Sequence, residues 1–96
     1  MTNFKLDISY DGTNFFGWQI QKNKRTVQGD IIKAFNKILG ANSYNLVGSG
    51  RTDSGVHANH QICNIKLETT LKPINIKNAL NANIDKDIFI NSCVSV

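Results

Sequence analysis

The chain opens with a regular alternation of apolar and polar residues. Every second residue from Phe4 to Tyr10 is apolar, and polar residues stand between them. A period of two is typical of a strand with one buried face. Asp11 and Gly12 follow as a turn signal, so the pattern predicts a first strand that ends near Tyr10.

A helical period replaces this alternation between Thr26 and Gly40. The apolar positions recur at a spacing of three and four residues, at Val27, Ile31, Ala34, Phe35 and Ile38. The Thr26 hydroxyl can cap the first turn, and Gly40 permits the left-handed backbone that often ends a helix. The pattern therefore predicts a helix between these two residues.

Two more strands are predicted before the next helix. One runs through Tyr44, Leu46 and Val47 into a glycine-rich segment. The other runs from about Val56 to Leu67, and its alternation places apolar residues on one face, at Cys63, Ile65 and Leu67. The glycine-rich segment then connects these two strands.

The last third of the chain predicts a helix and a final strand. Pro73 suits the first turn of a helix, whose shared face carries Ile76, Ala79, Leu80 and Asn83. In the final strand we expect one face to carry Ile88, Ile90, Val94 and Val96, and the other to carry Phe89, Asn91, Cys93 and Ser95.

The predicted order, strand-helix-strand-strand-helix-strand, is typical of the α+β ferredoxin-like fold, with two helices on one face of a four-stranded antiparallel sheet. The expected spatial order of the strands is 4-1-3-2. Strand one then separates the strands that carry Cys63 and Cys93, at two inter-strand steps of roughly 9.6 Å. That separation excludes a disulfide, so we expect both cysteines to be reduced and to serve as small apolar residues.

Composition sets broad limits on function. The 96 residues suffice for one small domain, and no apolar run is long enough to cross a bilayer. No basic segment followed by an apolar one stands near Met1, so we expect a soluble, cytoplasmic protein with no membrane partner. The net charge of +4 fits a polyanionic partner but does not identify one.

The segment from Gly48 to Ala58 is the strongest candidate site. It holds Asp53 among small residues, with Arg51 two positions before it and glycines at 48, 50 and 55. Glycines let a bulky ligand approach the main chain. Asp-Ser-Gly alone is also ordinary turn chemistry, but a plain turn requires neither the extra glycines nor the cation. A functional site and a turn therefore both stay open from these residues.

Common cofactor motifs are not met. A dinucleotide fingerprint starting at Gly48 requires a glycine where Asp53 stands, and no Gly-Lys-Ser/Thr follows, so neither NAD nor ATP is implied. His57, His60 and Cys63 resemble a metal pattern by spacing only. On an extended strand His57 and Cys63 are about 20 Å apart, too far to share one ion. We expect no cofactor and no metal.

The segment between the first strand and first helix holds aromatic and basic residues. Phe15, Phe16 and Trp18 either stack on bases or close one end of the core, and core packing is the commoner role. Lys22, Lys24 and Arg25 either contact phosphates or form a solvated loop.

Three segments together resemble the bacterial tRNA pseudouridine synthase A family. They run from Tyr10 to Gln21 (YDGTNFFGWQIQ), from Arg25 to Gly29 (RTVQG) and from Gly50 to Ala58 (GRTDSGVHA). The likeness covers the whole chain but only the amino-terminal half of a family member. It implies that residues 1–96 form the domain with the catalytic aspartate, that a carboxy-terminal domain is absent from this chain, and that the isolated fragment is inactive.

The resemblance also assigns roles to residues of this chain. Asp53 would be the catalytic carboxylate, and Arg51 would fill the space left by the flipped uridine. Site-lining or RNA contacts are implied for Gly50, Thr52, Gly55, His57, Lys22, Lys24 and Arg25. The implied partner is the anticodon arm of tRNA, and the full-length protein would be a homodimer. His60 stands where the family often has glycine.

The main alternative is a non-catalytic ferredoxin-like RNA-binding module. Such modules stack bases on strand aromatics, and the predicted strand from Val56 to Leu67 contains none. A third possibility is a partner-binding domain that uses the edge of its last strand.

Overall fold

The computed structural model describes residues 2–40, 46–48 and 54–96. Its elements follow the predicted order, with one addition. They are β1 (Thr2–Tyr10), the 3-10 turn η1 (Gly12–Asn14), α1 (Val27–Leu39), β2 (Leu46–Gly48), β3 (Ala58–Leu67), α2 (Pro73–Asn83) and β4 (Ile88–Ser95). The α+β fold class is confirmed, whereas η1 was not predicted because it is one short turn without a periodic signal.

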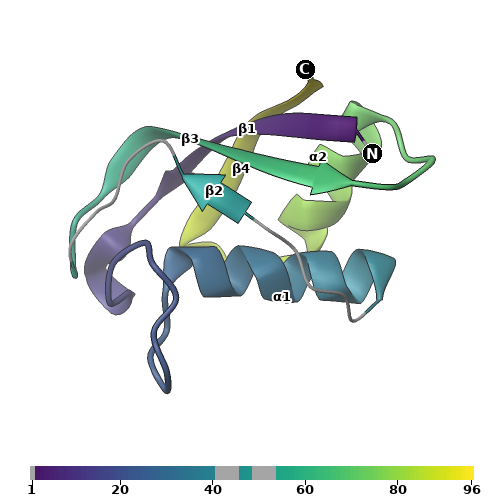
Figure 1. The fold of residues 1–96 in the computed structure, drawn as a ribbon. Helices are drawn as coiled ribbons and strands as arrows, with labels where there is room; N and C mark the ends of the chain where they lie inside the picture. The colour runs from purple at the N-terminus through teal and green to yellow at the C-terminus, as the bar shows by residue number, and fades with distance from the viewer. Residues whose placement is uncertain (1, 41–45, 49–53) are drawn as a thin grey trace.

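The strands form one antiparallel sheet in the order β2-β3-β1-β4. This is the predicted arrangement, with β1 and β3 in the centre. Both helices lie on the same side of the sheet, so the other side is left uncovered by helices (Figure 1). The end of β1 and the start of β3 meet at one end of the sheet, because Tyr10 pairs with Ala58. This end carries the candidate site.

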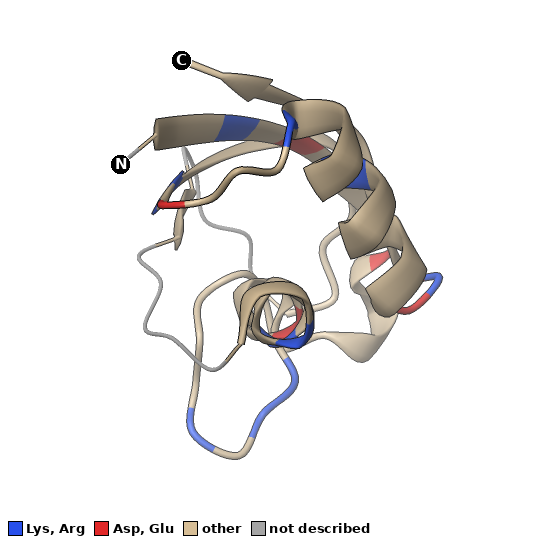
Figure 2. Ribbon diagram, turned by 90° about the vertical axis from the view of Figure 1, so that its right-hand side faces the viewer, with Lys and Arg blue, Asp and Glu red and all other residues tan. Residues whose placement is uncertain are grey.

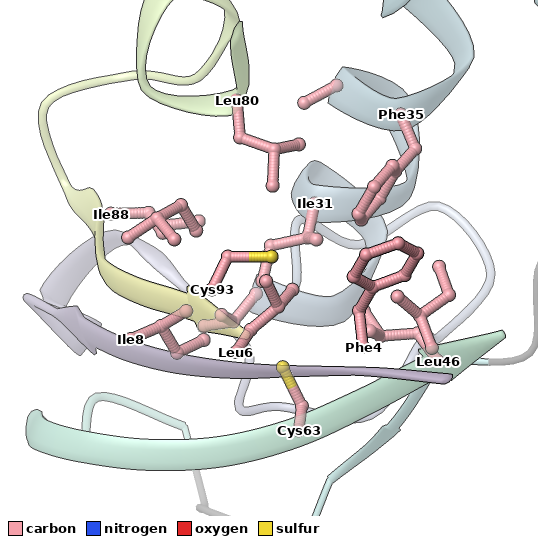
Figure 3. Close-up of a cluster of buried hydrophobic side chains, with 14 of the residues drawn as sticks. Phe4, Leu6, Ile8, Ile31, Phe35, Leu46, Cys63, Leu80, Ile88 and Cys93 are labelled. Atoms are coloured by element: carbon pink, nitrogen blue, oxygen red, sulfur yellow. The ribbon is translucent and has the colours of Figure 1, made fainter. Parts of the chain in front are cut away.

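The core lies between the covered face of the sheet and the two helices (Figure 3). Leu6 is at its centre, flanked in register by Cys63 on β3 and by Cys93 on β4. Both cysteines are free, as predicted, and both are buried. Burial in this apolar layer raises the pKa of the Cys63 thiol to about 12 and that of Cys93 to about 11.

The prediction for the faces of β4 is wrong beyond Ile90. Ile8 pairs with Ile90 and Asp7 pairs with Ser92, so Asn91 is an extra residue in a bulge. One inserted residue moves every later side chain to the opposite face. Cys93 therefore points into the core, and Val94 is exposed.

Local signals explain the two helices unequally. The Thr26 hydroxyl accepts a hydrogen bond from the Gly29 amide, and α1 ends at Gly40 with a φ of 87°, as the sequence predicted. The helix α2 has no side-chain cap and begins with Pro73 in its first turn. It is held by the burial of Ile76 and Leu80.

Polar side chains gather on the open face of the sheet. His60 lies 3.1 Å from both carboxylate oxygens of Asp7, and Asn91 donates to the same carboxylate at 3.2 Å. Ser9 completes the group through a hydrogen bond to Asn91.

No helix in the described residues is long and apolar enough to cross a membrane.

Candidate active site

Two loops meet at the end of the sheet where β1 stops and β3 starts. The first is the turn from Asp11 to Phe15, and the second runs from Ser54 to His57. The Phe15 carbonyl accepts two hydrogen bonds, from the Ser54 hydroxyl and from the Gly55 amide, each 3.2 Å long. Gly55 has a φ of 81°, in the left-handed region that favours glycine. We call this contact the loop interface.

His57 and Gly12 form the second half of the loop interface. The Gly12 amide donates to Nδ1 of His57 at 2.9 Å. Oδ1 of Asp11 lies 3.1 Å from the same nitrogen. Hydrogen bonds from the Thr13 hydroxyl and amide, together with His57, lower the pKa of the Asp11 carboxyl. An ionised acid thus stands beside the imidazole.

A hairpin-like segment, residues 16–25, projects from the loop interface. Phe16 donates its amide to the Arg25 carbonyl at 2.8 Å, and Gln21 bridges to Lys24. Lys22 and Lys24 are exposed near the end of this segment, which leaves the body of the domain below α1 (Figure 2). The Lys24 ammonium lies 4.8 Å from the centre of the Phe16 ring. These two lysines can reach a polyanion.

Arg25 has a different environment from the two lysines. Its guanidinium pairs with Asp30 and Asp87 at 3.0 Å and with Asp85 at 3.2 Å. It also lies 4.2 Å from the centre of the Phe15 ring. Although burial opposes the charge, the hydrogen bonds that the guanidinium donates to Asp87 and Asp30 raise its pKa. Arg25 therefore connects the segment 16–25, α1 and the turn before β4.

The other aromatic residues divide between the two expected roles. Phe15 and Trp18 are buried in the core, as core packing predicts. Phe16 is 46% exposed beside Lys24, so it is the one of the three that can meet a ligand.

Four of the predicted site residues lie outside the described part of the chain, namely Gly50, Arg51, Thr52 and Asp53. Of the others, Gly55 and His57 are brought together with Gly12 and Phe15 in the loop interface. Lys22 and Lys24 lie on the projecting segment. The roles assigned to all of these residues stay predictions.

Sequence reasoning missed the parts of the site that depend on backbone contacts. The sequence indicates Gly12 only as a turn residue, and no pattern in it shows that Gly12 faces Val56. Likewise, nothing in the sequence pairs Arg25 with Asp85 and Asp87, which are about 60 positions away. Within residues 2–40, 46–48 and 54–96, no three His, Cys, Asp or Glu side chains are grouped as metal ligands.

The fold and the loop interface define a class: a ferredoxin-like α+β domain with glycine-bearing loops at one end of its central strands. A family model described as tRNA pseudouridine synthase matches residues 8–95. The chain belongs to this family.

Individual relatives agree with the family match. The chain is 50% identical over 91 residues to tRNA pseudouridine synthase A of Brachyspira hyodysenteriae, an alignment that covers 94% of this chain and 36% of the relative. It is 51% identical over 96 residues to tRNA pseudouridine synthase A of Caldicellulosiruptor saccharolyticus, covering 100% of this chain and 39% of the relative. The chain thus spans less than two fifths of the length of either relative.

Proposed function

We propose that the protein to which this chain belongs is a tRNA pseudouridine synthase, an isomerase that converts uridine to pseudouridine in the anticodon arm of tRNA. The observation that carries the proposal is the match over residues 8–95, which includes the segment Gly50–Ala58 around Asp53. The loop interface supports it, because Ser54 and Gly55, directly after Asp53, are hydrogen-bonded to Phe15, which lies in the first of the three family segments.

The chemistry is an isomerisation. The bond between N1 of uracil and C1′ of the ribose breaks, the base turns, and C1′ joins C5 while the C5 proton is lost and N1 gains a proton. Atoms and electrons balance without an oxidant or ATP. Asp53 acts as a nucleophile or base towards the sugar or the ring, which requires the ionised carboxylate. Arg51, two positions away, would favour that ionised state.

The uridine must leave its stack before it reacts, at a cost of a few kcal/mol that contacts elsewhere offset. Arg51 would occupy the vacated space, while Gly50, Thr52 and Gly55 line the site. Phosphate contacts are assigned to Lys22 and Lys24, which are exposed on segment 16–25. For Arg25 the ion pairs with three carboxylates support a structural role.

The remaining properties follow the family. The complete protein would be a cytoplasmic homodimer, with a further domain that completes the active site. The relatives are more than twice as long as this chain, which supports the further domain. We therefore expect the 96-residue chain alone not to convert uridine. Sedimentation of the full-length gene product tests whether it is a dimer. Conversion of uridine by residues 1–96 alone would show that the further domain is not needed for activity.

The decisive experiment compares two carboxylate variants of the full-length protein. Asp53→Asn removes the proposed catalytic charge, and Glu68→Gln makes the same change on an exposed residue just after β3. Analysis of the anticodon arm of tRNA from a strain lacking the enzyme should show no added pseudouridine after incubation with Asp53→Asn and wild-type amounts with Glu68→Gln. Full conversion by Asp53→Asn would refute the assigned role. Tight tRNA binding without conversion by the wild type would favour an RNA-binding module.

A further inference from the structure

In the loop interface there is no space for a side chain at Gly12. A Cβ added to Gly12 would overlap the carbonyl oxygen of Val56 and would lie 2.5 Å from its carbonyl carbon and 3.0 Å from that of Gly55. Real Cβ atoms do not approach backbone this closely, so only glycine permits the observed contact. The main chain of the 54–57 loop therefore rests directly on the turn after β1.

The hydrogen bond between Gly12 and His57 specifies a protonation state. Because the Gly12 amide donates to Nδ1, that nitrogen must present a lone pair. The neutral imidazole then carries its proton on Nε2. Asp11 can accept a hydrogen bond from Nδ1 only when that nitrogen carries a proton, in the other neutral tautomer or in the imidazolium, and Gly12 then loses its acceptor. The contact with Gly12 thus belongs to neutral His57.

Other charged groups also face this imidazole. His57 lines a pocket of about 410 Å³ together with Asp11 after β1 and with Lys86 and Asp87 before β4. The Asp87 carbonyl also accepts a hydrogen bond from the Asp11 amide at 2.9 Å. The pocket walls therefore carry one cation and two carboxylates, and across the loop interface His57 contacts both the Gly12 amide and the Asp11 carboxylate.

We propose that Gly12 and His57 are positioning residues for the carboxylate of Asp53. The proposal rests on the proposed function. Ser54 is bonded directly to Asp53, and the chain from Ser54 to His57 is held at both ends, by the Phe15 carbonyl and by the Gly12 amide. Loss of either attachment lets the reacting carboxylate move relative to the uridine. A displacement of about 1 Å can lower a rate by about 100-fold.

The test compares His57→Leu with His57→Asn in the full-length protein. Leucine fills the space without an acceptor, whereas Oδ1 of asparagine can take the place of Nδ1. We expect His57→Leu to lower kcat by about 10- to 100-fold with KM for tRNA changed less than about threefold, since the phosphate contacts lie elsewhere. His57→Asn should restore kcat to within about threefold of the wild type.

Equal activity of His57→Leu and the wild type would overturn the proposal. So would inactivity of both variants, because His57 would then act through something other than its Nδ1 acceptor.

Amide hydrogen exchange separates this proposal from the proposed function. The Gly55 amide donates to Phe15, so its exchange should accelerate at least about tenfold in His57→Leu and stay slow in His57→Asn. If the wild type forms no pseudouridine but the exchange rates differ in this way, the proposed function fails and the docking by His57 stands. Unchanged exchange in His57→Leu would refute the docking, whatever the activity.

Discussion

The core and the loop interface are held together by different physical means. In the core, side chains such as Leu6, Phe35 and Leu80 are completely buried and contribute through apolar area and close packing. In the loop interface, Ser54, Gly55 and His57 are exposed, and the contact consists of three hydrogen bonds and the close backbone approach at Gly12. The core therefore determines whether the domain folds, while the loop interface determines how its loops are placed.

The largest effect is expected in the core. Leu80→Ala should lower the free energy of unfolding by about 2–5 kcal/mol, because it removes buried methyl groups and leaves a cavity. Urea denaturation measures the change. The matched control is Ile74→Ala on the same helix, where the side chain is 55% exposed and the loss should stay below about 0.5 kcal/mol. Equal losses would show that α2 does not pack as described.

The next largest loss of stability is expected when one methyl group is added at Gly12 in the loop interface. Gly12→Ala forces the turn away from Val56, with an expected loss of about 1–3 kcal/mol in the free energy of unfolding. Asn14→Ala changes an exposed residue of the same turn and should cost less than about 0.5 kcal/mol. An unchanged denaturation midpoint for Gly12→Ala would mean that the two loops do not touch.

Arg25 connects the loop interface to the rest of the domain through the Phe15 ring. Arg25→Met leaves Asp30 and Asp87 without their ion pairs, and we expect a loss of about 1–2 kcal/mol, reduced in high salt. Lys22→Met on the same segment removes an exposed charge and should not change stability measurably. A stability loss for Arg25→Met as small as that for Lys22→Met would contradict the structural role of Arg25.

The cap of α1 should contribute less. Thr26→Ala removes the oxygen that accepts from the Gly29 amide, and the expected loss is about 1 kcal/mol. Thr26→Ser keeps the hydroxyl and should retain most of the stability. Thermal unfolding of the two variants side by side gives the comparison, and indistinguishable melting temperatures would exclude a capping role.

The smallest effect at neutral pH concerns the core thiols. Their pKa values of about 12 and about 11 exceed the usual value near 9, so the folded state keeps both thiols neutral. This contribution to stability is fully present below pH 9 and is lost as the pH rises through the folded values. Alkylation at pH 8.5 should be at least about 100-fold slower in the folded protein than in urea. Similar rates in both would contradict burial of Cys63 and Cys93.

Much of the fold could be predicted from local patterns. The alternation of β1, the Thr26 cap and the apolar spacing of α1 depend on residues close together in the chain. The bulge at Asn91 could not be predicted, because it depends on how β4 pairs with Ile8 and Asp7. The same is true of Arg25, which looks like Lys22 and Lys24 in sequence. Its three carboxylate partners include Asp85 and Asp87, which only the folded chain brings near.

By itself, the sequence determined the order of strands and helices and the motif around Asp53, because these depend on periodicity and on residue types at short spacing. Only the tertiary structure decided that Gly12 contacts Val56 and that neutral His57 accepts a hydrogen bond from Gly12. The physical reason is that both contacts join residues about 45 positions apart, which no local pattern relates and which only the folded backbone brings together.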